Sequence, residues 1–253
     1  MLTLLVMVTI AVMTLILGPV VVVAHLLGVP QGPRSIYARA LRLWARSLNA
    51  AAGVKVRTHN AERLQNEHGA VVVANHVSWF DIFALAVEVP WCSFIAKAEL
   101  RRLPLFGFAA ESAGIVFLDR DNRMQAFEQY RVAAQEVQRG RRIIVCPEGT
   151  RGLDYHLRPF KKGPFVLAIA SQAPIIPTIV HGAREVMPKG SFRIRSGVVD
   201  VHFLEPVPTV GYDYEHRQEL MQRVWDQMAD EMRARYGIGT AERAIAPEGV
   251  RSE

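Results

Sequence analysis

Two patterns of apolar positions divide the chain, and the first fills its N-terminal end. Residues 2–24 are apolar or small throughout, and the first charged side chain is Arg34. A helix over this run, rising about 1.5 Å per residue, is long enough to cross a hydrocarbon layer about 30 Å thick. Gly18 and Pro19 interrupt the run, so the sequence allows either a spanning helix or a kinked, re-entrant one.

The segment that follows, residues 36–48, combines apolar and basic positions at helical spacing. Ile36, Ala40, Leu41, Trp44 and Leu48 recur on one side, whereas Arg39, Arg42 and Arg46 fall mostly on the other. This pattern predicts a basic amphipathic helix with a tryptophan anchor in the plane of an anionic membrane surface. The alternative is a helix that packs on the core and exposes its arginines to solvent. Arginines after an apolar span favour the cytoplasmic side, so we expect the rest of the chain on the cytoplasmic face of the inner (plasma) membrane.

Beyond about Ala52 short β-rich runs alternate with helical stretches. Strands are predicted at residues 70–74, 93–96, 115–118, 142–145, 174–180 and 198–204, and helices at 81–89, 122–139, 164–171 and 216–236. This alternation predicts an α/β fold in which helices pack on a sheet. We therefore divide the chain into a membrane-associated helical segment (1–50), one α/β domain (51–236) and a flexible tail (237–253).

The net charge restricts the class of partner. The 30 Lys and Arg residues outnumber the 24 Asp and Glu residues, which gives a net charge of +6. Such a balance suits either nucleic acid or an anionic membrane with phosphorylated substrates. The apolar N-terminus favours the membrane, so no nucleic-acid partner is expected.

Several classes of site lose support. The two cysteines, Cys92 and Cys146, are far apart in apolar surroundings, so we expect buried, reduced thiols. The sequence has no zinc-ligand spacing, no G-x-S-x-G elbow, no Walker loop and no G-x-G-x-x-G. These absences argue against a metal site, a hydrolase and a nucleotide-binding protein.

The strongest candidate for catalysis follows the predicted strand at residues 70–74. His76 comes just after the strand, and Asp81 opens the next predicted helix. In α/β sheets ligands bind at the carboxyl ends of strands. A histidine there can take a proton from a substrate hydroxyl when a carboxylate orients its other ring nitrogen. Ser78 and Asp81 also fit a capping box, in which Asp81 serves the helix N-terminus; the two roles are compatible.

Other predicted strand ends carry groups suited to an anionic substrate. Glycine permits close approach of the backbone to a ligand, and arginine offers a planar fork of donors for phosphate. Each group has an ordinary alternative, because glycine-containing turns are common and exposed cations are usually solvated. The candidates are Lys97, Arg120, Glu148, Gly149, Thr150 and Arg151.

In order and chemistry, these residues resemble the PlsC-type 1-acyl-sn-glycerol-3-phosphate acyltransferase family. His76 and Asp81 match its His-x4-Asp motif. The similarity covers roughly residues 71–180, and four blocks in the right order make it specific. Cys146 stands where Phe is usual and Gly152 where Ser is usual, which leaves the fit of the substrate open. The other matching segments are Lys97, 104–107, 114–120, 147–151 and 174–177.

The resemblance implies a mixed sheet flanked by helices and a membrane-bound glycerolipid acyltransferase. His76 would be the general base, oriented by Asp81, with Lys97 and Gly149 beside the oxyanion. The acceptor would be lysophosphatidic acid among membrane lipids, and the product phosphatidic acid. The donor would be acyl-CoA or acyl carrier protein, with no metal and no cofactor. The substrate-binding residues would be Arg120, Glu148, Thr150, Arg151 and Pro177, of which Pro177 shapes the acceptor or acyl pocket.

Three other functions remain open at this point. The acceptor can be another lyso-lipid, such as lyso-ornithine lipid, with the arginines around a different head group. A non-catalytic membrane-surface protein would use only the amphipathic helix. A lipid hydrolase would use water in place of the hydroxyl.

Overall fold

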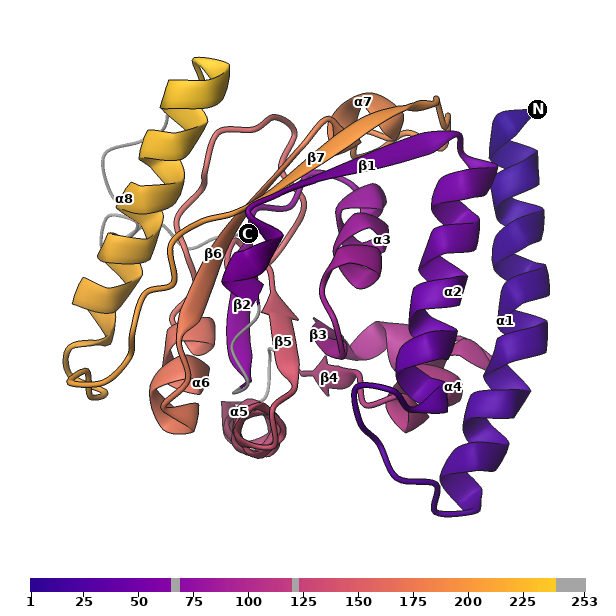
Figure 1. Cartoon of the computed structure of the whole chain (residues 1–253), viewed down its shortest axis with the longest axis horizontal. Coiled ribbons are helices and arrows are strands. Elements are labelled where there is room, and N and C mark those ends of the chain that lie inside the picture. The colour runs from indigo at the N-terminus through magenta and orange to yellow at the C-terminus, as the bar shows by residue number, and fades with distance from the viewer. Residues whose placement is uncertain (65–68, 120–122, 240–253) are drawn as a thin grey trace.

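The computed structural model describes residues 1–64, 69–119 and 123–239, in which seven strands form one sheet (Figure 1). The strand order is β1-β7-β6-β2-β5-β3-β4. Only β6 and β7 pair antiparallel in this sheet, so the predicted mixed α/β fold is confirmed. The strands are β1 (Val54–His59), β2 (Ala70–Ala74), β3 (Cys92–Lys97), β4 (Val116–Leu118), β5 (Arg142–Val145), β6 (Ile175–His181) and β7 (Gly197–Phe203).

Helices cover both faces of the sheet (Figure 1). Because successive side chains of a strand point to opposite faces, the central strands divide their residues between two cores. Val72, Ile144 and Ile176 pack with α2 and α3, whereas Val73 and Ile143 pack with α5, α6 and α8. The helices are α1 (Leu2–Leu26), α2 (Ile36–Ala51), α3 (Trp79–Glu88), α4 (Phe106–Ser112), α5 (Arg123–Gln138), α6 (Gly163–Ser171), α7 (Ala183–Val186) and α8 (Arg217–Tyr236).

The element boundaries differ from the predictions where local signals are weak. Every predicted strand is present to within a residue or two, but β1, α4 and α7 were not predicted. Helix α3 starts at Trp79 rather than Asp81, because Ser78 is its N-cap and Asp81 occupies the first turn. Short 3-10 turns at Ala61–Leu64 and Ala98–Arg102 complete the described elements. The predicted tail is described only to residue 239.

Helix α1 runs unbroken through Gly18 and Pro19 and lies beside α2 (Figure 1). It is the one helix in the described ranges that is long and apolar enough to cross a membrane. Many of its apolar side chains are exposed, among them Leu4, Leu15 and Leu26. This exposure supports an association of the N-terminal end with a membrane.

Helix α2 packs inside the protein, contrary to the predicted placement of its apolar side on a membrane surface. Ala45 and Leu48 are fully buried in the core between α2 and the sheet. Trp44, expected as a membrane anchor, donates its indole N–H to Thr14 Oγ1 (3.1 Å) and packs edge-to-face on Phe83. The helical periodicity was correct, but neighbouring helices and the sheet cover the apolar side. This outcome matches the core-packed alternative.

Asn75 ties the end of β2 to β6 just before His76. Its amide donates to Val180 O (3.0 Å) and accepts from Val180 N (2.8 Å), and both residues are buried. We expect Asn75→Ala to lower the free energy of unfolding by roughly 2–4 kcal/mol, because two buried backbone groups lose their partners. Denaturant unfolding in detergent micelles measures this change.

Gln227→Ala is the matched control for that substitution. Its side chain makes one exposed hydrogen bond, to Glu205 O, so its loss should change stability by less than about 0.5 kcal/mol. Equal effects of the two substitutions would show that the Asn75 bridge does not stabilise the sheet.

Candidate active site

His76 and Asp81 meet at the carboxyl end of β2. The Nδ1 atom of His76 lies 2.9 Å from Oδ2 of Asp81, whose side chain is fully buried. The same oxygen accepts the backbone N–H groups of Val77 and Ser78, each at 2.7 Å. An oxygen that already accepts two N–H groups favours the tautomer in which Nδ1 also donates. That tautomer leaves Nε2 of His76 with a lone pair for a substrate proton.

The capping role of Asp81 is also present. Ser78 accepts from the backbone N–H of Phe80 (3.2 Å) and donates to Met187 O (2.8 Å), while Asp81 closes the capping box. The start of α3 is therefore fixed by the carboxylate that contacts the imidazole. Asp81 therefore both contacts His76 and caps α3, which are the two roles that the sequence suggested.

The loop after β5 wraps around the backbone of His76. Glu148 Oε1 accepts the His76 N–H (3.1 Å), and His76 O accepts the Gly152 N–H (2.7 Å). The other carboxylate oxygen of Glu148 accepts from Nε of Arg158 (2.9 Å). Burial raises the pKa of Glu148, and the charge of Arg158 partly opposes that rise. Glu148 therefore holds His76 in place through its backbone.

Two neighbours of Glu148 in this loop have different surroundings. The guanidinium of Arg151 lies over the Trp79 ring, 5.2 Å from its centroid. Burial lowers the pKa of Arg151, and the nearby carboxylate of Asp81 partly opposes this. The backbone N–H of Gly149, whose φ is +79°, donates to Cys146 O (3.1 Å), so it is engaged in its own turn.

The remaining predicted site residues lie in three different places. Lys97 ends β3 with its side chain exposed, and its Nζ is 3.8 Å from a carboxylate oxygen of Glu99. Pro177 is buried within β6, opposite Val73 of β2. Arg120 lies outside the described residues. The catalytic and binding roles of these residues stay predictions.

A cavity of about 1590 Å³ opens at this loop and contains most of these groups. Helices α1, α2, α3 and α4 supply an apolar part of its wall, for example through Leu17, Leu41, Phe83 and Phe106. Pro177 is not among its lining residues. The polar side chains in its wall include His76, Lys97, Glu148, Thr150, Arg151 and Arg158.

A base beside cationic groups and a long apolar wall suits a substrate with an anionic head and a hydrocarbon chain. The sequence profile of the family described as Acyltransferase matches residues 55–181, which is half of the chain and includes the His76–Asp81 pair. The chain belongs to the acyltransferase family.

Named relatives of this acyltransferase agree with that assignment. The 1-acyl-sn-glycerol-3-phosphate acyltransferase alpha of Homo sapiens is 33% identical over 75% of this chain and 68% of its own length. The 1-acyl-sn-glycerol-3-phosphate acyltransferase of Saccharomyces cerevisiae is 31% identical over 72% of this chain. That match spans 61% of the yeast protein, so the chain corresponds to about two thirds of these relatives.

A solved structure shares the fold over nearly the whole chain. It is the crystal structure of PlsC, the 1-acyl-sn-glycerophosphate (LPA) acyltransferase of Thermotoga maritima. Its TM-score is 0.76 at 25% sequence identity, and the match covers 93% of this chain and 96% of that one.

One residue of the site in this acyltransferase was missed by sequence reasoning. Arg158 lies in an irregular segment ten residues beyond Glu148, not at a strand end, so no motif or periodicity marks it. It also donates to Thr150 O, and thereby holds both ends of the loop. The departure at Gly152 has a steric reason, since a Cβ there would lie 2.8 Å from Asp154 O.

We expect Arg158→Ala to destabilise the protein in a pH-dependent way. At about pH 8 the loss should be roughly 2–4 kcal/mol, because a carboxylate that is 3% exposed loses its cation. Screening keeps the loss moderate, since 34% of the Arg158 side chain is exposed. Without Arg158 the pKa of Glu148 rises further, so the carboxyl takes up a proton more readily as the pH falls, and the loss at about pH 5 should be smaller than at about pH 8.

Urea unfolding at the two pH values measures this difference, with Arg233→Ala as the control. Arg233 forms an ion pair with Asp230 in which both side chains are exposed, and its removal should have little effect at either pH. A loss for Arg158→Ala that does not change with pH would contradict the pairing with a buried carboxylate.

Proposed function

We propose that this acyltransferase transfers an acyl group from a thioester to the 2-hydroxyl of lysophosphatidic acid, giving phosphatidic acid. The observation that carries the proposal is the His76–Asp81 pair in the wall of a cavity with cationic and apolar parts. The names of the human and yeast relatives support the same acceptor.

The proposed chemistry needs one general base and no covalent acyl-enzyme. Nε2 of His76 takes the proton of the substrate hydroxyl while the hydroxyl oxygen attacks the carbonyl carbon of the thioester. The C–S bond then breaks, and the departing thiolate takes the proton from the imidazolium. Asp81 stabilises that imidazolium through Nδ1, which is 2.9 Å from its carboxylate.

Arg151 is the best-placed described cation for the phosphate. Its guanidinium lies over the Trp79 ring, and the side chain lines the same cavity as His76. A planar guanidinium can bind phosphate through two parallel hydrogen bonds, which would orient the hydroxyl toward the base. Lys97 remains the proposed partner of the oxyanion, because the Gly149 N–H already donates to Cys146 O.

The apolar wall of the cavity fits the hydrocarbon part of the substrates. Part of it comes from α1 and α2, and α1 also has many exposed apolar side chains. The proposed arrangement has α1 in the bilayer and the cavity beside it, so that a lyso-lipid enters from the membrane. We place the domain at the cytoplasmic face, with acyl-CoA or acyl carrier protein as donor and no metal or other cofactor in the reaction.

We expect His76→Ala to lower kcat for acyl transfer by at least about 10²–10⁴-fold, because the attacking hydroxyl loses its base. The assay uses the purified chain in detergent micelles with lysophosphatidic acid and either acyl-CoA or acyl carrier protein thioester. Product analysis by mass spectrometry identifies the acylated lipid. His216→Ala serves as the control, since His216 is exposed and bonds only within its own surface turn.

Lyso-ornithine lipid is offered in parallel to test the acceptor. Transfer to lysophosphatidic acid that His76→Ala abolishes would support both the reaction and the base. Transfer to lyso-ornithine lipid alone would keep the mechanism and replace the substrate. Full activity of His76→Ala would exclude this residue as the base, and hydrolysis without transfer would favour the hydrolase.

A further inference from the structure

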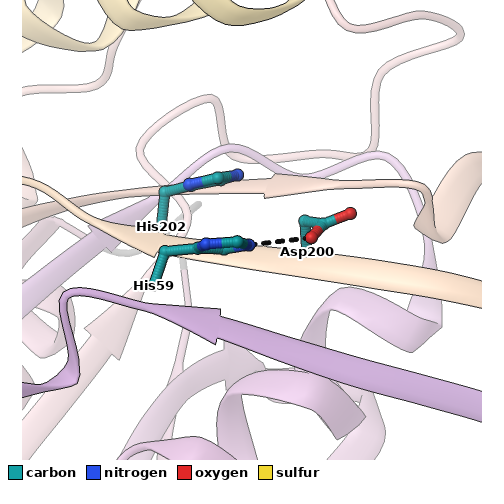
Figure 2. Close-up of side chains that lie close together, drawn as sticks. All are labelled: His59, Asp200 and His202. Carbon is teal, nitrogen blue, oxygen red and sulfur yellow. Dashed lines mark hydrogen bonds and ion pairs between the residues drawn. The ribbon is translucent and has the colours of Figure 1, made fainter.

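Two histidines and an aspartate meet on β1 and β7, away from the cavity that contains His76. They are His59, Asp200 and His202 (Figure 2), and none of them lines that cavity. His59 is more than 140 residues away from Asp200 and His202 in sequence, so spacing along the chain does not reveal the cluster. The interpretation from sequence, that no set of metal ligands is present, applies only to ligands close together in the chain.

The sheet register brings these three side chains together. Strands β1 and β7 are parallel, and His59 is the direct partner of His202 in that ladder. Asp200 lies two residues before His202 on β7, so its side chain points to the same face of the sheet. Figure 2 shows the two imidazole rings one above the other, with the Asp200 carboxylate at their edge. The positions are therefore fixed by backbone hydrogen bonds rather than by a flexible loop.

The donor atoms are close enough for a shared ion. Nε2 of His59 lies 2.8 Å from Oδ1 of Asp200, and one donor atom from each of the three residues lies within 4.8 Å of the others. The rings stack with centroids 4.1 Å apart. In a tetrahedral zinc site, donors about 2.0–2.2 Å from the metal lie roughly 3.3 Å apart. Because parallel stacked rings do not point their lone pairs at one ion, coordination requires the His59 ring, whose side chain is 38% exposed, to turn out of the stack.

The surroundings of His202 favour a ligand role. His202 is 3% exposed, and its Nδ1 has no hydrogen-bond partner. Its Nε2 lies 2.7 Å from the hydroxyl of Tyr236, the last residue of α8.

We infer that His59, Asp200 and His202 form a binding site for a divalent transition-metal ion of the zinc class. Two imidazoles and one carboxylate are donors that suit zinc, whereas calcium and magnesium prefer oxygen ligands throughout. The Tyr236 hydroxyl lies beside the site and, with water, can complete the coordination. Bound metal would cross-link the edge strand β1 to β7 and to the end of α8, so the site is structural.

Metal titration of the full chain, prepared without a histidine tag and stripped with a chelator, tests this inference. Isothermal titration with zinc should show one equivalent bound, and cobalt should give the visible absorption of a tetrahedral nitrogen–oxygen site. Zinc should also raise the Tm, because the ion binds the folded state only. None of these measurements depends on acyl transfer.

Two substitutions at the site and one outside it make the test specific. Loss of a residue that only orients a metal ligand weakens metal binding by about 10–100-fold. His59→Ala and Asp200→Asn each remove a ligand, so each should weaken zinc binding by more than that. His216→Ala should leave binding unchanged, because its exposed pair with Asp213 belongs to no cluster of three potential ligands among the described residues. Circular dichroism confirms that each variant is folded. Zinc binding that survives both site substitutions, or no binding by the folded wild-type chain, would overturn the inference.

Discussion

The carboxylate of Asp81 is the interaction on which the arrangement of the site depends. One buried oxygen accepts the backbone N–H groups of Val77 and Ser78 and contacts Nδ1 of His76. The turn between β2 and α3, the start of α3 and the orientation of the imidazole are consequently fixed together. A carboxylate that served only as a cap would leave the ring free to rotate, and one that served only the ring would leave two buried donors without a partner.

A second layer of contacts holds the backbone of the same histidine. Glu148 accepts the His76 N–H and is itself paired with Arg158, while Gly152 donates to the His76 carbonyl. The loop after β5 is thus a clamp on β2 as well as part of the cavity wall. This arrangement gives Glu148 a positional role that its place in a substrate-binding motif does not suggest. Of the groups in this loop, Arg151 is the cation that stacks on Trp79 and faces the cavity.

The sequence predicted the fold well because its strands are strongly apolar and its helices periodic. The runs at 70–74 and 142–145 appear as β2 and β5 with the same boundaries. Strand β1 was missed because it lies at the edge of the sheet, where Lys55 and Arg57 alternate with apolar residues and face solvent. Edge strands need no continuous apolar run, so their sequences resemble loops. The His76–Asp81 pair could be predicted because it is local, whereas the partners of Glu148 depend on tertiary contacts.

The N-terminal helices α1 and α2 form part of the cavity wall, although the predicted boundary at residue 50 separates them from the α/β domain. Leu17 of α1 and Leu41 of α2 line the cavity, and Trp44 packs between α1 and α3. Helix α1, many of whose apolar side chains are exposed, is therefore also a wall of the cavity. In the proposed function, a helix that contacts lipid on one side and lines the cavity on the other would bring a poorly soluble acyl chain to His76 without exposing it to water. The arginines of α2 are exposed, and one of them, Arg42, donates to Val87 O at the end of α3.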